Sequence, residues 1–148
     1  MKSNNLGLPI LGGLLAAVAG AAIWAIIAIL TEYEIGIVAW AIGGLSGLAV
    51  IFFAKQEVNN AHQFIAVISS LLGIFLGKYF IFGYYFNNGD LAGLVAGETI
   101  VYFQQFFSSF FEFIDIIFIL LAVVTAWQLP GKLVKEATPV NSNAEAAE

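Results

Sequence analysis

The sequence contains apolar stretches that are long enough to cross a lipid bilayer as helices. A hydrocarbon core about 30 Å thick requires about 20 apolar residues in helical conformation. Four stretches meet or approach this length, and none carries more than one charged residue: residues 8–30, 35–54, 64–86 and 113–129. We therefore predict an all-α polytopic membrane protein with four transmembrane helices, arranged as two hairpins.

The composition excludes several classes of protein. The 148 residues are 61% hydrophobic and only 10% charged, with a mean hydropathy of +0.94. A typical soluble domain is about 45–50% apolar and about 25% charged, so this chain has too little polar surface to fold in water. There is no cysteine and only one histidine, His62, so neither a disulfide framework nor a metal or other cofactor is predicted. With five basic residues and a pI of about 4.7, no nucleic-acid partner is expected.

Polar segments separate the predicted helices. Residues 31–34 form a turn after the first helix, residues 55–63 a polar connector after the second, and residues 87–90 a turn after the third. Pro130 is typical of a helix end, and closes the fourth. Residues 17–19 resemble a signal-peptide cleavage site, but the apolar stretch continues well beyond them, so we expect the first helix to be retained.

The segment before the last span, residues 91–111, is less apolar than the four spans. Its phenylalanines recur at three- and four-residue spacing, as on one face of a helix: Phe103, Phe106, Phe107, Phe110 and Phe111. This pattern favours an interfacial helical segment. The sequence leaves open whether that segment lies on the membrane surface or is partly inserted.

The lysines favour one orientation in the membrane. In a four-span arrangement those outside the spans all fall on one side: Lys2, Lys55, Lys132 and Lys135. Positive residues remain cytoplasmic, so we expect a multi-pass protein of the bacterial cytoplasmic (inner) membrane with both termini in the cytoplasm. Residues 1–7 then form an N-terminal tail and residues 8–135 the transmembrane domain. Residues 136–148 form a disordered tail, because they have little apolar surface to bury.

Small residues recur every four positions in the first three spans. Helices in lipid associate through such stripes, because small side chains allow close approach. The stripes are Gly12, Ala16 and Gly20; Ala39, Gly43 and Gly47; and Ser69, Gly73 and Gly77. The fourth span has only Ala122 and Ala126. We expect the first three helices to pack tightly and the fourth more loosely; the alternative is that small residues are merely common in membrane helices.

Two charged residues lie inside predicted spans, where ionisable groups are costly and mark functional sites by default. Lys78 lies fourteen residues after Phe64, and Asp115 lies fourteen residues before Leu129. At about 1.5 Å per residue, both lie about 21 Å from the cytoplasmic edge. Trp40 reaches a similar depth in the second span, so its ring can offer a face to the ammonium group of Lys78.

Two further acids belong to this candidate cluster: Glu112, one turn further out, and Glu34, at the outer end of the second span. The functional interpretation is an outer-leaflet site for an ion, a proton or a lipid head group. The structural interpretation is a Lys78–Asp115 pair that fixes the register of the last two helices, or a lysine that extends outward to water. We favour the structural interpretation, because one pair does not make a transport path.

One catalytic motif is considered and rejected. Residues 44–47, Gly-Leu-Ser-Gly, resemble the Gly-x-Ser-Gly motif of rhomboid intramembrane proteases. Ser46 is expected about 12 Å inside the membrane, whereas His62 is expected in the solvated connector, so the two cannot form a nucleophile–base pair. Helix packing explains Ser46 better, and no enzyme is predicted.

Several segments resemble a family of small, uncharacterised bacterial multi-pass membrane proteins. They are the Thr-x-Tyr-Glu-Ile-Gly turn at residues 31–36, the sequence Leu-Gly-Lys-Tyr-Phe at 76–80 and the sequence Asp-Ile-Ile-Phe at 115–118. The resemblance extends to about Lys132 and implies membrane location and architecture, but no activity.

These observations predict a non-enzymatic membrane protein that acts as a scaffold, an accessory subunit or an assembly subunit. The expected partners are the lipid bilayer and either a second copy or another membrane protein. The alternative is an oligomeric transporter or binding protein for a small solute, an ion or a lipid. That alternative would use the cluster of Lys78, Asp115, Glu112 and Glu34.

Overall fold

The computed structural model describes residues 5–55 and 58–137, and within them the chain is helical without strands. The elements in order are α1 (Gly7–Thr31), α2 (Gly36–Ala54), α3 (Asn60–Phe86), the 3-10 helix η1 (Leu91–Val95), α4 (Gly97–Gln105), α5 (Phe107–Phe110) and α6 (Phe113–Ala137). The all-α class is confirmed. Lys2 and residues 138–148 of the predicted C-terminal tail lie outside the described residues.

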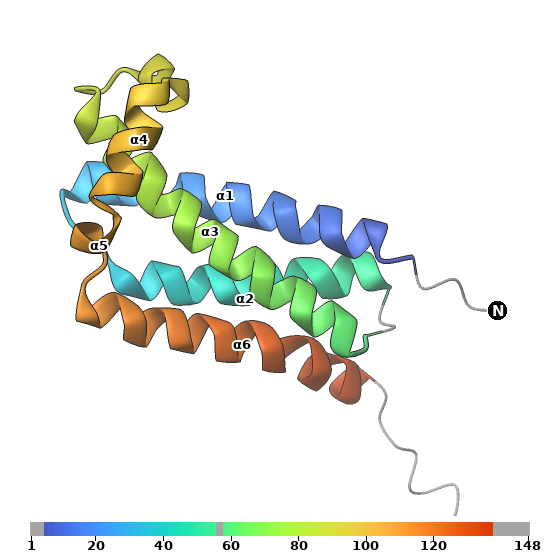
Figure 1. The fold of residues 1–148 in the computed structure, drawn as a ribbon. Helices are drawn as coiled ribbons and strands as arrows, with labels where there is room; N and C mark the ends of the chain where they lie inside the picture. The colour runs from blue at the N-terminus through green and yellow to red at the C-terminus, as the bar shows by residue number, and fades with distance from the viewer. Residues whose placement is uncertain (1–4, 56–57, 138–148) are drawn as a thin grey trace, which may run out of the picture.

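Four of these helices are long and apolar enough to cross a membrane, as predicted: α1, α2, α3 and the part of α6 from Phe113 to Leu133. They alternate in direction (Figure 1). We call the end where α1 begins and α6 ends the proximal end of the bundle. The opposite end, which carries the α1–α2 turn and residues 87–112, is the distal end.

The most extensive packing joins helices that run in the same direction. α1 packs on α3 and α2 packs on α6, while α2 and α3 lie between α1 and α6 (Figure 1). The main core cluster takes residues from all four helices: Trp24, Ala25, Ala28, Ala39, Ile42, Ile74, Ile81 and Ala122. The hairpins predicted from chain order are therefore tied together by the parallel contacts that cross between them.

All nine members of the small-residue stripes are buried, and they lie where helices approach closely. A β-carbon on Gly73 would stand 3.2 Å from the backbone of Ala17, on the neighbouring α1. A β-carbon on Gly43 would stand 2.5 Å from the carbonyl oxygen of Ala122 on α6. The expectation of a loosely packed fourth helix is therefore wrong at this face, because Gly43 and Ala122 together let α2 and α6 touch through their backbones.

The third helix begins earlier than predicted. Asn59 caps it by accepting a hydrogen bond from the backbone N–H of Ala61, and the backbone N–H of Asn59 donates to Nδ1 of His62 at 3.2 Å. This reciprocal capping box starts the helix at Asn60. The prediction of His62 as a solvated connector residue is wrong, because the ring is buried in the first turn of α3.

The last helix continues past Pro130, where the sequence predicted its end. Proline cannot donate to the carbonyl four residues earlier, which belongs to Ala126. Membrane helices tolerate this missing hydrogen bond when neighbouring groups form hydrogen bonds with the backbone around the proline. Here Nε2 of Gln63 on α3 donates to the carbonyl oxygen of Trp127 at 2.7 Å. This bond is made to the carbonyl next to the one that the proline leaves without its helical donor, and α6 continues past the proline to Ala137.

Residues 91–110 form three short helices rather than one. After Asn87–Asp90, the chain turns back and α4 runs beside the distal part of α3 (Figure 1). Asn87 Nδ2 donates to Thr99 Oγ1 at 3.0 Å, and Thr99 Oγ1 donates to the carbonyl oxygen of Gly93 at 2.7 Å. These bonds fasten the returning segment to the end of α3.

Aromatic side chains fill the space between α3 and the returning segment. The ring of Phe103 is buried and lies 5.4 Å from Phe75, 5.2 Å from Tyr79 and 5.5 Å from Phe82, centroid to centroid. Phe75 lies eleven residues before the end of α3, about 16 Å along the helix axis. The phenylalanine spacing in the sequence thus marks a face that packs on α3 well inside the span.

Candidate functional site

The candidate site is centred on Lys78, which lies in the distal half of α3 and is only 4% exposed. Gly77 precedes it, and a β-carbon there would stand 2.5 Å from the indole of Trp24. The absence of a side chain at Gly77 thus allows the Trp24 indole to lie against α3. Its ring centroid is 5.8 Å from Lys78 Nζ, within the range of a cation–π interaction.

The ammonium group of Lys78 has three hydrogen-bond partners. It donates to Oε2 of Glu34, to Oδ2 of Asp115 at 3.0 Å and to the carbonyl oxygen of Phe110 at 3.1 Å. An ammonium group has three N–H donors, so this set uses its full capacity. The contacts join the α1–α2 turn, the distal half of α3, the end of α5 and the first turn of α6 at one point.

The α1–α2 turn places Glu34 beside Lys78. α1 ends at Thr31, whose hydroxyl donates to the carbonyl oxygen of Ile27 at 2.7 Å, and Glu32 follows in left-handed conformation with φ 58°. The backbone N–H of Tyr33 then donates to Thr31 Oγ1 at 3.3 Å. The turn reverses the chain within a few residues. Glu34, two residues before the start of α2, therefore lies at the depth of the lysine.

Asp115 is held by its position in the first turn of α6. Its Oδ2 accepts a hydrogen bond from the backbone N–H of Glu112 at 2.8 Å as well as the bond from Lys78. This satisfies a donor that the helix start leaves without an intrahelical partner, and a carboxylate is favourable near a helix N-terminus. The aspartate is thus oriented by its own helix before it meets the lysine.

The structure brings three of the five predicted cluster residues together: Lys78, Asp115 and Glu34. Glu112 contributes its backbone, while its side chain is exposed. Trp40 is not part of the cluster. Its indole Nε1 donates to Thr125 Oγ1 at 2.7 Å, so it faces α6 rather than α3, and the expectation of a Trp40–Lys78 contact is wrong. Thr125 lies about 15 Å further along α6 than Asp115, so Trp40 differs from Lys78 in depth as well as in the helix it faces.

Sequence reasoning missed the aromatic residues that do cover the ammonium. Besides Trp24, the ring of Phe111 lies 5.6 Å from Lys78 Nζ, and Phe110 supplies its carbonyl oxygen. Counting sixteen residues from Leu8 places Trp24 about 24 Å into the first span, close to the depth of Lys78. The sequence therefore indicated that Trp24 and Lys78 lie at similar depth, but it did not indicate that α1 and α3 are neighbours.

The serine and histidine of the rejected protease motif stay apart in the structure. Ser46 is fully buried within α2, and its hydroxyl makes no hydrogen bond within the described part of the chain. His62 bonds Asn59 at the proximal start of α3. Among the described residues there is also no group of three metal-ligating side chains close enough to share an ion.

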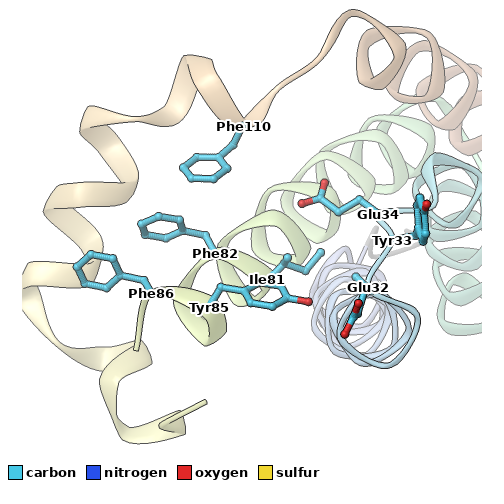
Figure 2. Close-up of a pocket in the computed structure, with 9 residues that line it drawn as sticks. Glu32, Tyr33, Glu34, Ile81, Phe82, Tyr85, Phe86 and Phe110 are labelled. Atoms are coloured by element: carbon cyan, nitrogen blue, oxygen red, sulfur yellow. The ribbon is translucent and has the colours of Figure 1, made fainter. Parts of the chain in front are cut away.

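A cleft of about 340 Å³ opens beside the cluster at the distal end. Figure 2 shows Glu32 and Glu34 on one side of it and the rings of Phe82, Phe86 and Phe110 on the other. The side chain of Glu34 is 37% exposed, whereas that of Lys78 is 3% exposed. The Glu34 carboxylate is therefore the part of the ion cluster that is accessible from the cleft.

The cluster combines one cation with two carboxylates and therefore carries one excess negative charge when all three groups are ionised. Such an arrangement can lock helices together, and its exposed carboxylate can attract a proton or a cation. No protein-family model, curated protein or solved structure matches the chain.

Proposed function

We propose that this chain is a non-enzymatic integral membrane protein that serves as a scaffold, an accessory subunit or an assembly subunit. The observation that carries the proposal is the full use of the Lys78 ammonium by Glu34, Asp115 and the Phe110 carbonyl. A lysine held by three partners inside one chain has no N–H left for a passing solute. We name this arrangement the Lys78 clamp.

A clamp of this kind favours a structural role. Removing one partner of a buried ion pair costs about 3–5 kcal/mol, because the remaining charge is left buried and unpaired. The clamp ties the α1–α2 turn, α3 and α6 together at the distal end, and so adds an ionic contact to the packing of α6 on α2 and α3. A rigid bundle suits a protein whose task is to present a surface to a partner.

The exposed face of α6 is evidence in favour of a partner within the membrane. Only 22% of its most apolar window is buried, the smallest share among the four spans. Its exposed side includes large apolar side chains: Ile114, Ile117, Leu121 and Val124. We propose that lipid, a second copy or another membrane protein covers this side. A nucleic-acid partner does not fit an acidic chain with five basic residues.

Charge distribution supports the proposed orientation. Of the described lysines outside the clamp, Lys55 and Lys132 lie at the proximal end, whereas Glu32, Asp90 and Glu98 lie at the distal end. By the positive-inside rule the proximal end faces the cytoplasm. We propose the bacterial cytoplasmic membrane as the location and the uncharacterised family described above as the chain's relatives. Accessibility of tags at both termini in intact cells tests the orientation.

The alternative is an oligomeric transporter or binding protein for a small solute, an ion or a lipid. The observation in its favour is the exposed carboxylate of Glu34, which connects the buried charges to a cleft. A single bundle of four spans offers little room for a path, so this alternative requires several copies.

Reconstitution in proteoliposomes separates the two functions. Wild type, Asp115→Asn and the control Glu98→Gln are compared, since Glu98 is an exposed distal acid outside the clamp. The structural role predicts equal background flux of protons and monovalent cations for all three, and co-purification of a stoichiometric membrane partner with wild type. Flux that is present in wild type and Glu98→Gln but lost in Asp115→Asn would replace the structural role with transport.

A further inference from the structure

The distal cleft has two chemically different walls. Glu32 and Glu34, from the α1–α2 turn, supply carboxylates (Figure 2). Phe82 and Phe86 from α3 and Phe110 from α5 supply rings; Phe82 lies 4.8 Å from Phe110 and 5.4 Å from Phe86, centroid to centroid. The aromatic wall is therefore continuous rather than a set of isolated rings.

The charges around the cleft select a cation. Glu32 adds a further negative charge to the Lys78 clamp, and no basic side chain of the described residues lines the cleft. Counting Lys78, Glu34, Asp115 and Glu32 gives two excess negative charges when all are ionised. Lys78 is occupied by its three partners, so it does not offer an anion a free donor.

The aromatic wall decides which kind of cation fits. A hard metal ion such as calcium requires six to eight oxygen ligands, and the described residues contain no group of three metal-ligating side chains. An ammonium with alkyl substituents, in contrast, is bound by ring faces together with nearby negative charge. The cleft volume of about 340 Å³ is within the range of small-molecule sites, about 300–1,000 Å³.

We propose that the distal cleft binds an alkylammonium cation, with Glu32 and Glu34 as counter-charges and the rings of Phe82, Phe86, Phe110 and Tyr85 as the apolar cage. The cation is a free solute or the headgroup of a lipid, since the cleft lies at the distal ends of the spans. The cleft shares Glu34 with the Lys78 clamp, but Glu32 and Tyr85 take no part in the clamp, so variants of these two residues test the cleft separately from the structural role.

The test is calorimetric titration of the full chain, purified in a maltoside detergent, with choline chloride. Sodium chloride and the neutral carbon isostere of choline serve as control ligands. We expect saturable binding of choline alone, weakened up to about fivefold by Glu32→Gln, since an exposed charge partner contributes at that level. Glu98→Gln, the matched loss of a distal charge outside the cleft, is expected to bind as wild type does.

The cage is tested at Tyr85, which lines the cleft and is half exposed. Tyr85→Leu removes the ring face and is expected to weaken binding, whereas Tyr85→Phe keeps the ring and is expected to restore it. Absence of saturable choline binding, equal binding of the neutral isostere, or unchanged binding in both Glu32→Gln and Tyr85→Leu would each overturn the proposal.

Nanodiscs distinguish the two sources of the cation. If a lipid headgroup occupies the cleft, nanodiscs of phosphatidylcholine abolish binding of added choline, while nanodiscs of phosphatidylglycerol retain it in a manner sensitive to Glu32→Gln. If the natural ligand is a free solute, both lipids allow the same Glu32-dependent binding. Binding that is insensitive to Glu32→Gln in both lipids would reflect attraction to the membrane surface and contradict the site.

Discussion

Gly77 and Trp24 meet so closely that the backbone of α3 lies against the indole of α1. A β-carbon on residue 77 would stand 2.5 Å from Cε3 of Trp24, and that indole in turn covers the ammonium of the neighbouring Lys78. One glycine therefore links the α1–α3 contact to the Lys78 clamp. A substitution at Gly77 that displaces Trp24 would therefore also disturb the cation–π contact of Lys78.

The first prediction concerns this contact. Gly77→Ala is expected to destabilise the protein by about 1–3 kcal/mol, because the added methyl group would overlap a buried indole and force it or α3 to shift. The matched control is Gly44→Ala, since a β-carbon at residue 44 meets nothing within 4 Å. Thermal unfolding in detergent measures both variants. Equal unfolding midpoints for the two would show that the close contact does not constrain the bundle.

The second prediction concerns the clamp. Lys78→Leu leaves the carboxylates of Glu34 and Asp115 without their cation, so a loss of about 3–5 kcal/mol is expected. The control Lys55→Leu removes an exposed lysine at the proximal end and is expected to change stability by no more than about 0.5 kcal/mol. Adding Asp115→Asn to Lys78→Leu is expected to recover part of the loss. Chemical denaturation of reconstituted protein provides the comparison; strictly additive effects would argue against a coupled pair.

The third prediction concerns the proline in α6. Gln63→Leu removes the side chain that donates to the Trp127 carbonyl, and loss of this hydrogen bond is expected to cost about 0.5–1.5 kcal/mol. Gln128→Leu is the control, because Gln128 is an exposed glutamine on α6, next to Trp127. Hydrogen exchange of residues 126–133 should rise in Gln63→Leu only. Unchanged exchange there would mean that water or lipid headgroups serve the carbonyl equally well.

The fourth prediction concerns the attachment of the returning segment. Thr99 is fully buried, and its hydroxyl bridges Asn87 and the Gly93 carbonyl. Thr99→Val keeps the shape but removes both bonds, so local opening of residues 91–105 is expected to become easier by about 1–3 kcal/mol. Limited proteolysis should then cut this segment faster while α1 stays protected. Equal cleavage in wild type and variant would assign the attachment to the phenylalanine packing alone.

The sequence by itself determined the four spans, their alternation and the common depth of Lys78 and Asp115. These are properties of each helix alone: lipid forces the backbone to bond within its own helix, and each residue then advances by a fixed 1.5 Å. The phenylalanine spacing likewise indicated helical structure before the last span, whereas its packing on α3 was not predicted. No knowledge of neighbours was needed for any of these inferences.

Only the tertiary structure decided which helices touch and through which side. The small-residue stripes marked one side of each of the first three spans, but the sequence does not say which helix that side meets, and Trp40 rather than Trp24 was expected beside Lys78. The same holds for the continuation of α6 past Pro130, where Gln63 from α3 bonds the Trp127 carbonyl. Helices in lipid gain nothing from hiding apolar surface, so their rotation and neighbours are set by close fits such as Gly77 on Trp24. Such fits exist only once the chain is assembled.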